Sequence, residues 1–129
     1  MKSIIISNPV WGYENYYKFC EYSLKSLLYE NNLPKLIKTY DVTLHILTKK
    51  SDHHLFKKNK TFQSLPKKIK IKFFFFSDSF FTFNKYHKVS DLQNESIKES
   101  TTKDYIIFNY ADFIWSDGSL SKSIELIKR

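Results

Sequence analysis

The sequence predicts an α/β fold in which a mostly parallel four-stranded sheet is flanked by helices. Short apolar runs of strand length alternate along the chain with segments whose apolar residues recur at helical spacing. The connections are long enough for the crossover helices that parallel strands need. Because the 129 residues contain no internal repeat and no Gly-, Ser- or Pro-rich linker, we expect one domain over residues 1–129.

The first half of the chain predicts two strands with helical segments between them. A branched apolar run at residues 4–6 is typical of a buried strand. Apolar residues at helical spacing follow over residues 16–28, and Asn31, Asn32 and Pro34 end that helix. After a short helical piece near residues 36–37, alternating apolar residues predict a second strand at 42–46 that ends near Thr48.

The second half predicts two more strands, each followed by a helical segment. Ser51 is a candidate N-cap for a short lysine-rich helix. Residues 69–76 form the third strand, and its four consecutive phenylalanines are expected in the core. A helix over residues 86–97 then leads to the apolar run 105–108, which suits a strand buried on both faces. A final helix follows from Leu120.

Composition indicates a globular protein of a reducing compartment. Hydrophobic residues make up 42% of the chain and aromatic residues 18%, which argues against disorder. The single cysteine, Cys20, excludes an internal disulfide framework. No apolar stretch approaches the roughly 18 residues of a membrane-spanning helix. We therefore expect a cytoplasmic protein without a membrane span.

The net charge of +8 leaves two interpretations open. Clustered basic residues attract nucleic acid or an anionic membrane surface. Here nearly all basic residues are lysines scattered among Asn, Ile, Tyr and Phe, a mixture that an AT-rich coding sequence also produces. We favour a solvated lysine surface. A noncatalytic module that binds nucleic acid or a protein partner through these lysines is the alternative.

Polar side chains follow the fourth predicted strand, and they are the main candidates for a binding site. Asn109, Tyr110 and Asp112 fall at its carboxyl end, where ligands collect in open α/β sheets. Asp117 and Gly118 then mark a turn before the last helix. The chain has only two glycines, so neither a Gly-rich dinucleotide-binding turn nor a phosphate-binding P-loop is possible.

The stretch FNYADFIWSDGSLSKSIELI, together with the order of elements, resembles the nucleotide-binding half of GT-A fold glycosyltransferases, particularly the family 2-like members. In that Rossmann-like half the fourth strand ends in an Asp-x-Asp or similar signature, followed by a small turn, a Gly, a Leu and a helix. The signature falls here on residues 110–112, with Gly118 and Leu120 in the matching positions. The resemblance covers the whole chain as topology and about twenty residues as motif.

The resemblance implies that the chain binds a nucleoside diphosphate sugar together with a divalent cation. Asp112 matches the second acid of the signature and would be the protein's ligand to Mg²⁺ or Mn²⁺, which would stabilise the departing diphosphate. Tyr110 stands where the family has its first acid. A phenol at that position would instead donate a hydrogen bond to a ribose hydroxyl or a phosphate.

Further nucleotide-sugar contacts are implied at three other places. The loop with Pro9, Val10 and Trp11 would contact the base and ribose, Asp78 would contact the base, and His87 would approach the diphosphate. A structural role is open for several of them. Trp11 would then pack under the sheet edge, Asp78 would cap the following helix, and His87 would be a structural histidine.

Catalysis would need parts that the resemblance places after this chain's last helix. The family's acceptor site and its catalytic base lie in a second half of the protein. We therefore expect a glycosyltransferase of the hexosyltransferase type only if a partner chain or a continuation supplies that half. No residue of the chain is singled out as the base, and an inactive fragment is a further alternative.

Overall fold

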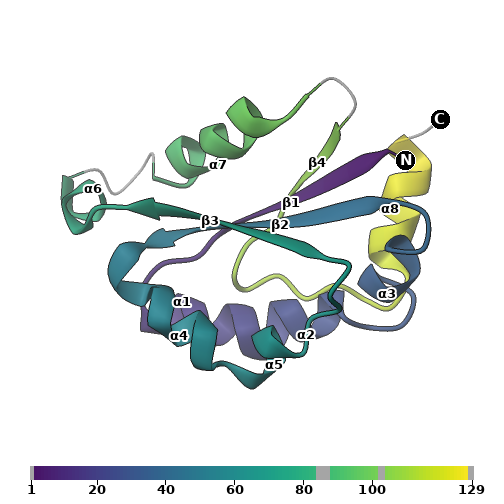
Figure 1. Cartoon of the computed structure of the whole chain (residues 1–129), viewed down its shortest axis with the longest axis horizontal. Coiled ribbons are helices and arrows are strands. Elements are labelled where there is room, and N and C mark those ends of the chain that lie inside the picture. Colours follow the sequence, from purple (N-terminus) through teal and green to yellow (C-terminus); the bar gives the residue numbers. More distant parts are fainter. Residues whose placement is uncertain (1, 84–87, 102–103, 128–129) are drawn as a thin grey trace.

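The computed structural model describes residues 2–83, 88–101 and 104–127 and confirms the α/β architecture. Its strands are β1 (Ser3–Pro9), β2 (Asp41–Lys49), β3 (Lys70–Phe76) and β4 (Asp104–Phe108). They form one four-stranded sheet in the order β3-β2-β1-β4, and every neighbouring pair is parallel. The resulting sheet has helices on both faces (Figure 1).

One face of the sheet is covered by the helices of the first half of the chain (Figure 1). The first helix is continuous through α1 (Tyr13–Lys18), a π-helical turn at Phe19–Ser23 and α2 (Leu24–Leu27). It begins earlier than expected, at Tyr13. Beside it lie α4 (His53–Lys58) and α5 (Lys60–Gln63), while α3 (Leu33–Leu36) contacts the last helix, α8 (Ser119–Ile127).

The opposite face is covered chiefly by α7 (Lys88–Glu99), with α6 (Asp78–Phe83) beyond the end of β3 (Figure 1). The buried Ser96 of α7 fixes the helix to the two central strands. Its Oγ lies 2.7 Å from Oγ of Ser7 and 2.9 Å from Nδ1 of His45. Among the described residues, no helix is both long enough and apolar enough to cross a membrane.

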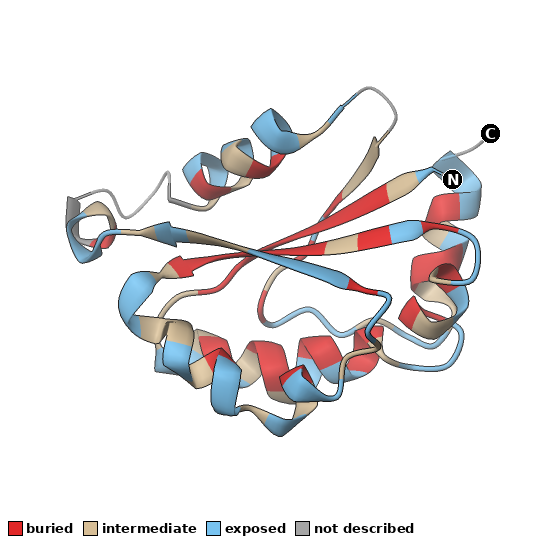
Figure 2. Ribbon diagram, in the orientation of Figure 1, coloured by how far each residue is buried: buried red, intermediate tan, exposed pale blue. Residues whose placement is uncertain are grey.

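The main core lies between the sheet and the first group of helices, and the buried residues concentrate on β1, β2 and these helices (Figure 2). Side chains alternate between the two faces along a strand, and the even-numbered residues of β1 and β2 point to the face that these helices cover. The largest fully buried side chains include Phe19, Phe56, Leu24 and Leu44. Phe56 contacts four other aromatic rings in this core.

Three expectations from the sequence need correction. The run 105–108 is an edge strand, where only Ile107 is buried and Phe108 is 39% exposed. The phenylalanines of β3 are only partly core, since β3 is the other edge and Phe75 is 43% exposed. Ser51 is not a helix N-cap, because it lies inside a 3₁₀ turn, Lys50–Asp52, that precedes α4.

Candidate functional site at the ends of β1 and β4

The strand order creates a switch point between β1 and β4. After β1 the chain moves outward to β2 and β3 on one side, and then returns to place β4 on the other side of β1. The helix that follows β1 covers one face of the sheet, whereas α7, which leads into β4, covers the other face. A crevice between two such strands is the usual ligand site of an open α/β sheet. A pocket of about 160 Å³ lies there, lined by Pro9, Trp11, Asn15, Lys18, Val89, Tyr110, Ala111 and Asp112.

The loop after β1 forms one wall of this switch-point pocket. Gly12 has a φ of 81°, which favours glycine, and its N–H donates to Oδ2 of Asp52 over 2.8 Å. This turn directs the chain into α1. Trp11 is half-buried and packs on Phe81, with ring centroids 5.2 Å apart. Trp11 thus packs at the sheet edge, as its structural alternative expected, and it also lines the pocket, while its contact with a base and ribose stays a prediction.

The helix α1 adds two polar residues that were not expected from the sequence. Asn15 donates from Nδ2 to the carbonyl oxygen of Trp11 over 2.9 Å. Lys18 pairs with Glu14 one turn earlier at 3.1 Å, and its side chain is 43% exposed. Asn15 and Lys18 are three positions apart, so they lie on the same side of the helix. The signal available in the sequence was a lysine on the helix that directly follows the first strand, and this signal did not distinguish Lys18 from other solvated charges.

The segment after β4 forms the other wall, and buried Asn109 fixes its position. Nδ2 of Asn109 donates to Oδ1 of Asn8 and to Oγ of Ser23, and its Oδ1 accepts from Nε1 of Trp115, each over 2.9 Å. The end of β4 is thereby tied to β1 and to the π-helical turn of the first helix. Asn109, expected among the polar residues of the site, is structural instead, and it positions the following residues 110–112.

A second buried amide holds the chain beyond the pocket. Oδ1 of Asn32 accepts from the backbone N–H groups of Gly118 and Leu120 at the start of α8. Asp117 accepts from both the backbone and the side chain of Asn31. Asp117 is therefore a turn residue, as its position beside Gly118 suggested.

The described residues that line the switch-point pocket include one carboxylate and one ammonium group. Asp112 is exposed and is the carboxylate among the lining residues, while Lys18 is the cation. Within the described parts of the chain, no group of three or more His, Cys, Asp or Glu side chains could hold a metal ion. A single carboxylate still fits Mg²⁺ or Mn²⁺ that arrives bound to phosphate oxygens, because such ions commonly keep only one or two protein carboxylates.

Two other expected site residues, Val10 and Asp78, lie outside this pocket. Val10 is fully buried in the main core, and its backbone N–H donates to the carbonyl oxygen of Leu47 over 2.9 Å. Asp78 is the first residue of α6 and accepts a hydrogen bond from Ser51 at 3.2 Å. It lines a separate pocket of about 400 Å³ beyond β2 and β3. His87 falls outside the described residues.

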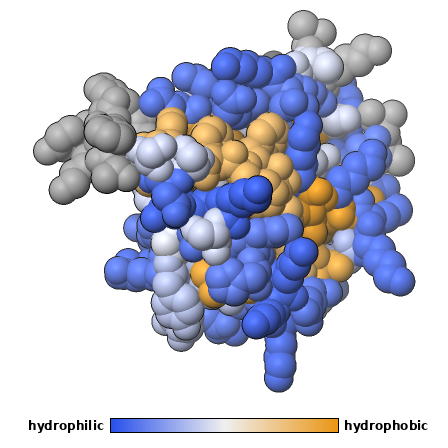
Figure 3. Space-filling model, turned by 60° about the vertical axis from the view of Figure 1, so that its left-hand side comes forward, coloured by the Kyte–Doolittle hydropathy of each residue, from blue (hydrophilic) through white to orange (hydrophobic). Residues whose placement is uncertain are grey.

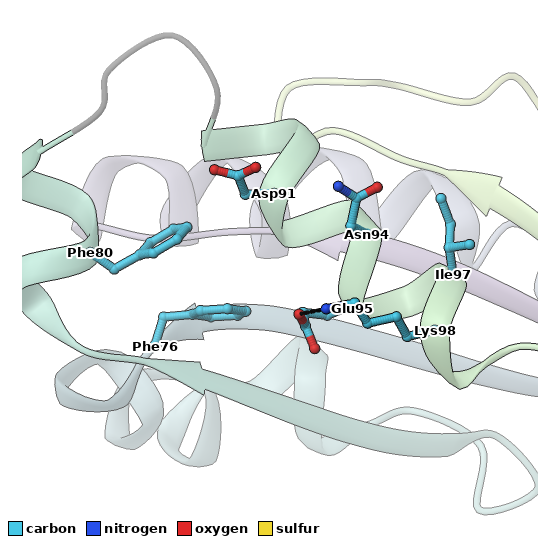
Figure 4. Close-up of a pocket in the computed structure, with 7 residues that line it drawn as sticks. All are labelled: Phe76, Phe80, Asp91, Asn94, Glu95, Ile97 and Lys98. Atoms are coloured by element: carbon cyan, nitrogen blue, oxygen red, sulfur yellow. Dashed lines mark hydrogen bonds and ion pairs between the residues drawn. The ribbon is translucent and has the colours of Figure 1, made fainter.

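A further pocket of about 330 Å³ separates α7 from the end of β3 and from α6 (Figure 4). The rings of Phe76 and Phe80 face it from one side, and residues of α7 from the other (Figure 4). Figure 3, in which this end of the molecule comes forward, shows apolar side chains gathered between hydrophilic ones. None of the expected site residues that the structure describes lines this pocket, whose described lining residues are Phe76, Phe80, Asp91, Asn94, Glu95, Ile97 and Lys98.

The lysines are distributed over many elements. They occur on α1, α2, α4, α5, β3 and α7 and in the loop before β3, so several sides of the fold carry them. Lys25, Lys72 and Lys98 each form an ion pair with a glutamate. Binding of nucleic acid through a lysine face stays a prediction, and this distribution does not favour it.

Comparison with known proteins finds no match: no family model, no curated protein and no solved structure is significantly similar to the chain.

Proposed function

We propose that the chain binds a nucleoside diphosphate sugar at the switch-point pocket, as the donor-binding half of a GT-A-like glycosyltransferase. The observation that carries the proposal is the convergence of Pro9, Trp11, Tyr110 and Asp112 in one pocket. These residues come from two segments about one hundred positions apart, and the sequence resemblance alone implies nucleotide-sugar contacts for all four. The pocket also lies where parallel α/β sheets usually bind ligands.

The lining residues match the chemistry of this ligand. A volume of about 160 Å³ is below the roughly 300 Å³ of a pocket for a complete drug-sized ligand, so it suits one part of the nucleotide sugar. We assign the diphosphate to it, because Lys18 and a cation held by Asp112 would both neutralise phosphate oxygens. The ring of Trp11 offers an apolar surface to the nucleoside or the sugar.

The residues of the chain would then have defined roles in sugar transfer. Asp112 would bind a divalent cation bridging the diphosphate, and such a cation stabilises the negative charge of the leaving group. Tyr110 would donate a hydrogen bond to a phosphate or ribose oxygen. Among the described lining residues Asp112 is the carboxylate, and the proposal assigns it to the cation, so the general base for the acceptor hydroxyl would come from outside this described lining.

Calorimetric titration with UDP and GDP, each with and without Mn²⁺, tests the proposal. We expect one of the two nucleotides to bind, more tightly with Mn²⁺ than without. The variant Asp112→Ala should lose most of the gain in nucleotide affinity that Mn²⁺ provides. Asp91→Ala is the matched control, because Asp91 is an exposed carboxylate that lines the pocket beside α7 instead.

Two results would contradict the proposal. One is the absence of binding of UDP, GDP and their sugar conjugates, with or without the metal. The other is binding whose dependence on Mn²⁺ is the same in Asp112→Ala, Asp91→Ala and the unchanged protein.

A further inference from the structure

We propose that Lys18 binds the diphosphate directly, so that this protein retains part of its affinity for the nucleotide when no divalent cation is present. The inference rests on the proposed function and identifies a binding residue that the signature around Asp112 does not contain. It starts from the charge of the pocket. Among the described residues, one carboxylate and one ammonium group line it, and Tyr110 adds a phenol.

This balance of charge changes what the pocket can do without a metal. Two acids at the end of β4 would repel a diphosphate until a cation neutralised them, because like charges at close range oppose binding. With Tyr110 at the first signature position, Asp112 contributes a single negative charge to the lining, and Lys18 offsets it. A diphosphate can therefore approach without a bridging ion.

Lys18 is placed to exchange its partner for a phosphate. Its Nζ lies 3.1 Å from Oε1 of Glu14, whose side chain is 83% exposed. An ion pair between such exposed groups contributes little stability, and salt screens it further. A diphosphate carries more negative charge than one carboxylate, so it attracts the ammonium group more strongly. When a diphosphate enters, Lys18 thus gains more from the ligand than it loses from Glu14.

The position of Lys18 is also well defined by its surroundings. The preceding residues of α1 are fixed at the turn through Gly12, which donates to Asp52, and at Asn15, which donates to the carbonyl oxygen of Trp11. The next residue, Phe19, is fully buried in the core. Only the side chain of Lys18 has to move for the contact to form.

The chain contains a matched control for Lys18. Lys25 lies seven positions further along the same continuous helix and pairs with Glu21 at 2.8 Å, also one turn earlier. Its side chain is 51% exposed, similar to that of Lys18, but Lys25 does not line the pocket. Replacing either lysine by glutamine removes the same charge and the same kind of pair.

The experiment is a titration of Lys18→Gln, Lys25→Gln and the unchanged protein with the nucleoside diphosphate that binds best, first in EDTA and then with Mn²⁺. We expect Lys18→Gln to weaken binding in EDTA about tenfold and by a smaller factor with Mn²⁺, since charge-assisted contacts are the stronger ones. Lys25→Gln should bind like the unchanged protein. The corresponding nucleoside, which lacks the diphosphate, should bind Lys18→Gln and the unchanged protein equally.

Glu14→Gln gives a second readout that does not depend on removing the lysine. Freed from its partner, Lys18 should bind the diphosphate about two- to threefold more tightly at low salt, since the exposed pair contributes only weakly. Equal affinity of Lys18→Gln and Lys25→Gln in EDTA would overturn the inference and leave the proposed function standing, and so would binding that vanishes completely in EDTA. Absence of nucleotide binding under all conditions would overturn both.

Discussion

Asn109→Ala is the substitution that most directly tests how the pocket is held in place. The Asn109 side chain is fully buried and makes three hydrogen bonds of 2.9 Å, with Asn8, Ser23 and Trp115. Alanine leaves two acceptors and the indole N–H of Trp115 without a protein partner. A typical buried hydrogen bond contributes about 1 kcal/mol net, and an unsatisfied partner costs about 1–3 kcal/mol. We expect unfolding to become easier by about 2–4 kcal/mol.

Urea denaturation followed by circular dichroism measures this loss, and thermal denaturation should show a lower Tm by roughly 10 °C. Asn94→Ala is the control, because Asn94 is exposed on α7 and its loss should change stability by less than about 0.5 kcal/mol. Nucleotide binding should also fall in Asn109→Ala, because residues 110–112 lose their anchor. If Asn109→Ala is as stable as Asn94→Ala, the account of how β4 is tied to β1 and the first helix is wrong.

Three other predictions concern the packing around this site. Burial, and then the charge of Lys72, lowers the pKa of His45, so the unfolded chain takes up a proton first as the pH falls below about 6.5. The unfolding free energy measured in urea should therefore drop between pH 7 and pH 5 in the unchanged protein, and it should depend less on pH in His45→Gln. The same pH dependence in both proteins would refute the lowered pKa of His45. Burial raises the pKa of Cys20 to about 12, so its reaction with iodoacetamide at pH 8 should be over about 100-fold slower than in urea, and fast labelling of the folded protein would contradict its buried position. Phe56→Ala should cost about 3–5 kcal/mol of unfolding free energy, whereas the partly exposed Phe75→Ala should cost far less; similar losses would mean that the core is misassigned.

The sequence predicted the type and order of the elements because periodicity is a local property. The branched run in β1 and the alternating residues of β2 mark strands whatever lies around them. The position of each strand in the sheet, central or at an edge, is not a local property. It depends on long-range pairing, so the apolar runs of β3 and β4 were expected to be more buried than edge strands allow.

For the candidate site as well, the sequence indicated some of the residues and missed others. The resemblance named Pro9, Trp11, Tyr110 and Asp112 as candidates, and the parallel pairing of β1 and β4 brings them to one pocket, because the carboxyl ends of neighbouring parallel strands meet at one sheet edge. Their contacts with a nucleotide sugar stay a prediction. Lys18 was missed, since a lysine on an amphipathic helix looks like any solvated charge until the helix is placed against the sheet. Asn109 looked like a ligand-binding residue because a buried hydrogen-bond network leaves no pattern in a single sequence.

The most direct test of the central claim is to map where a nucleoside diphosphate binds, by ¹⁵N-resolved NMR titration of the whole chain with UDP and GDP in the presence of Mg²⁺. We predict that the largest shifts fall on the amides of Trp11, Lys18, Tyr110 and Asp112, at the ends of β1 and β4. Shifts confined to the α7 pocket around Asp91 and Glu95, or the absence of any saturable shift, would contradict the claim.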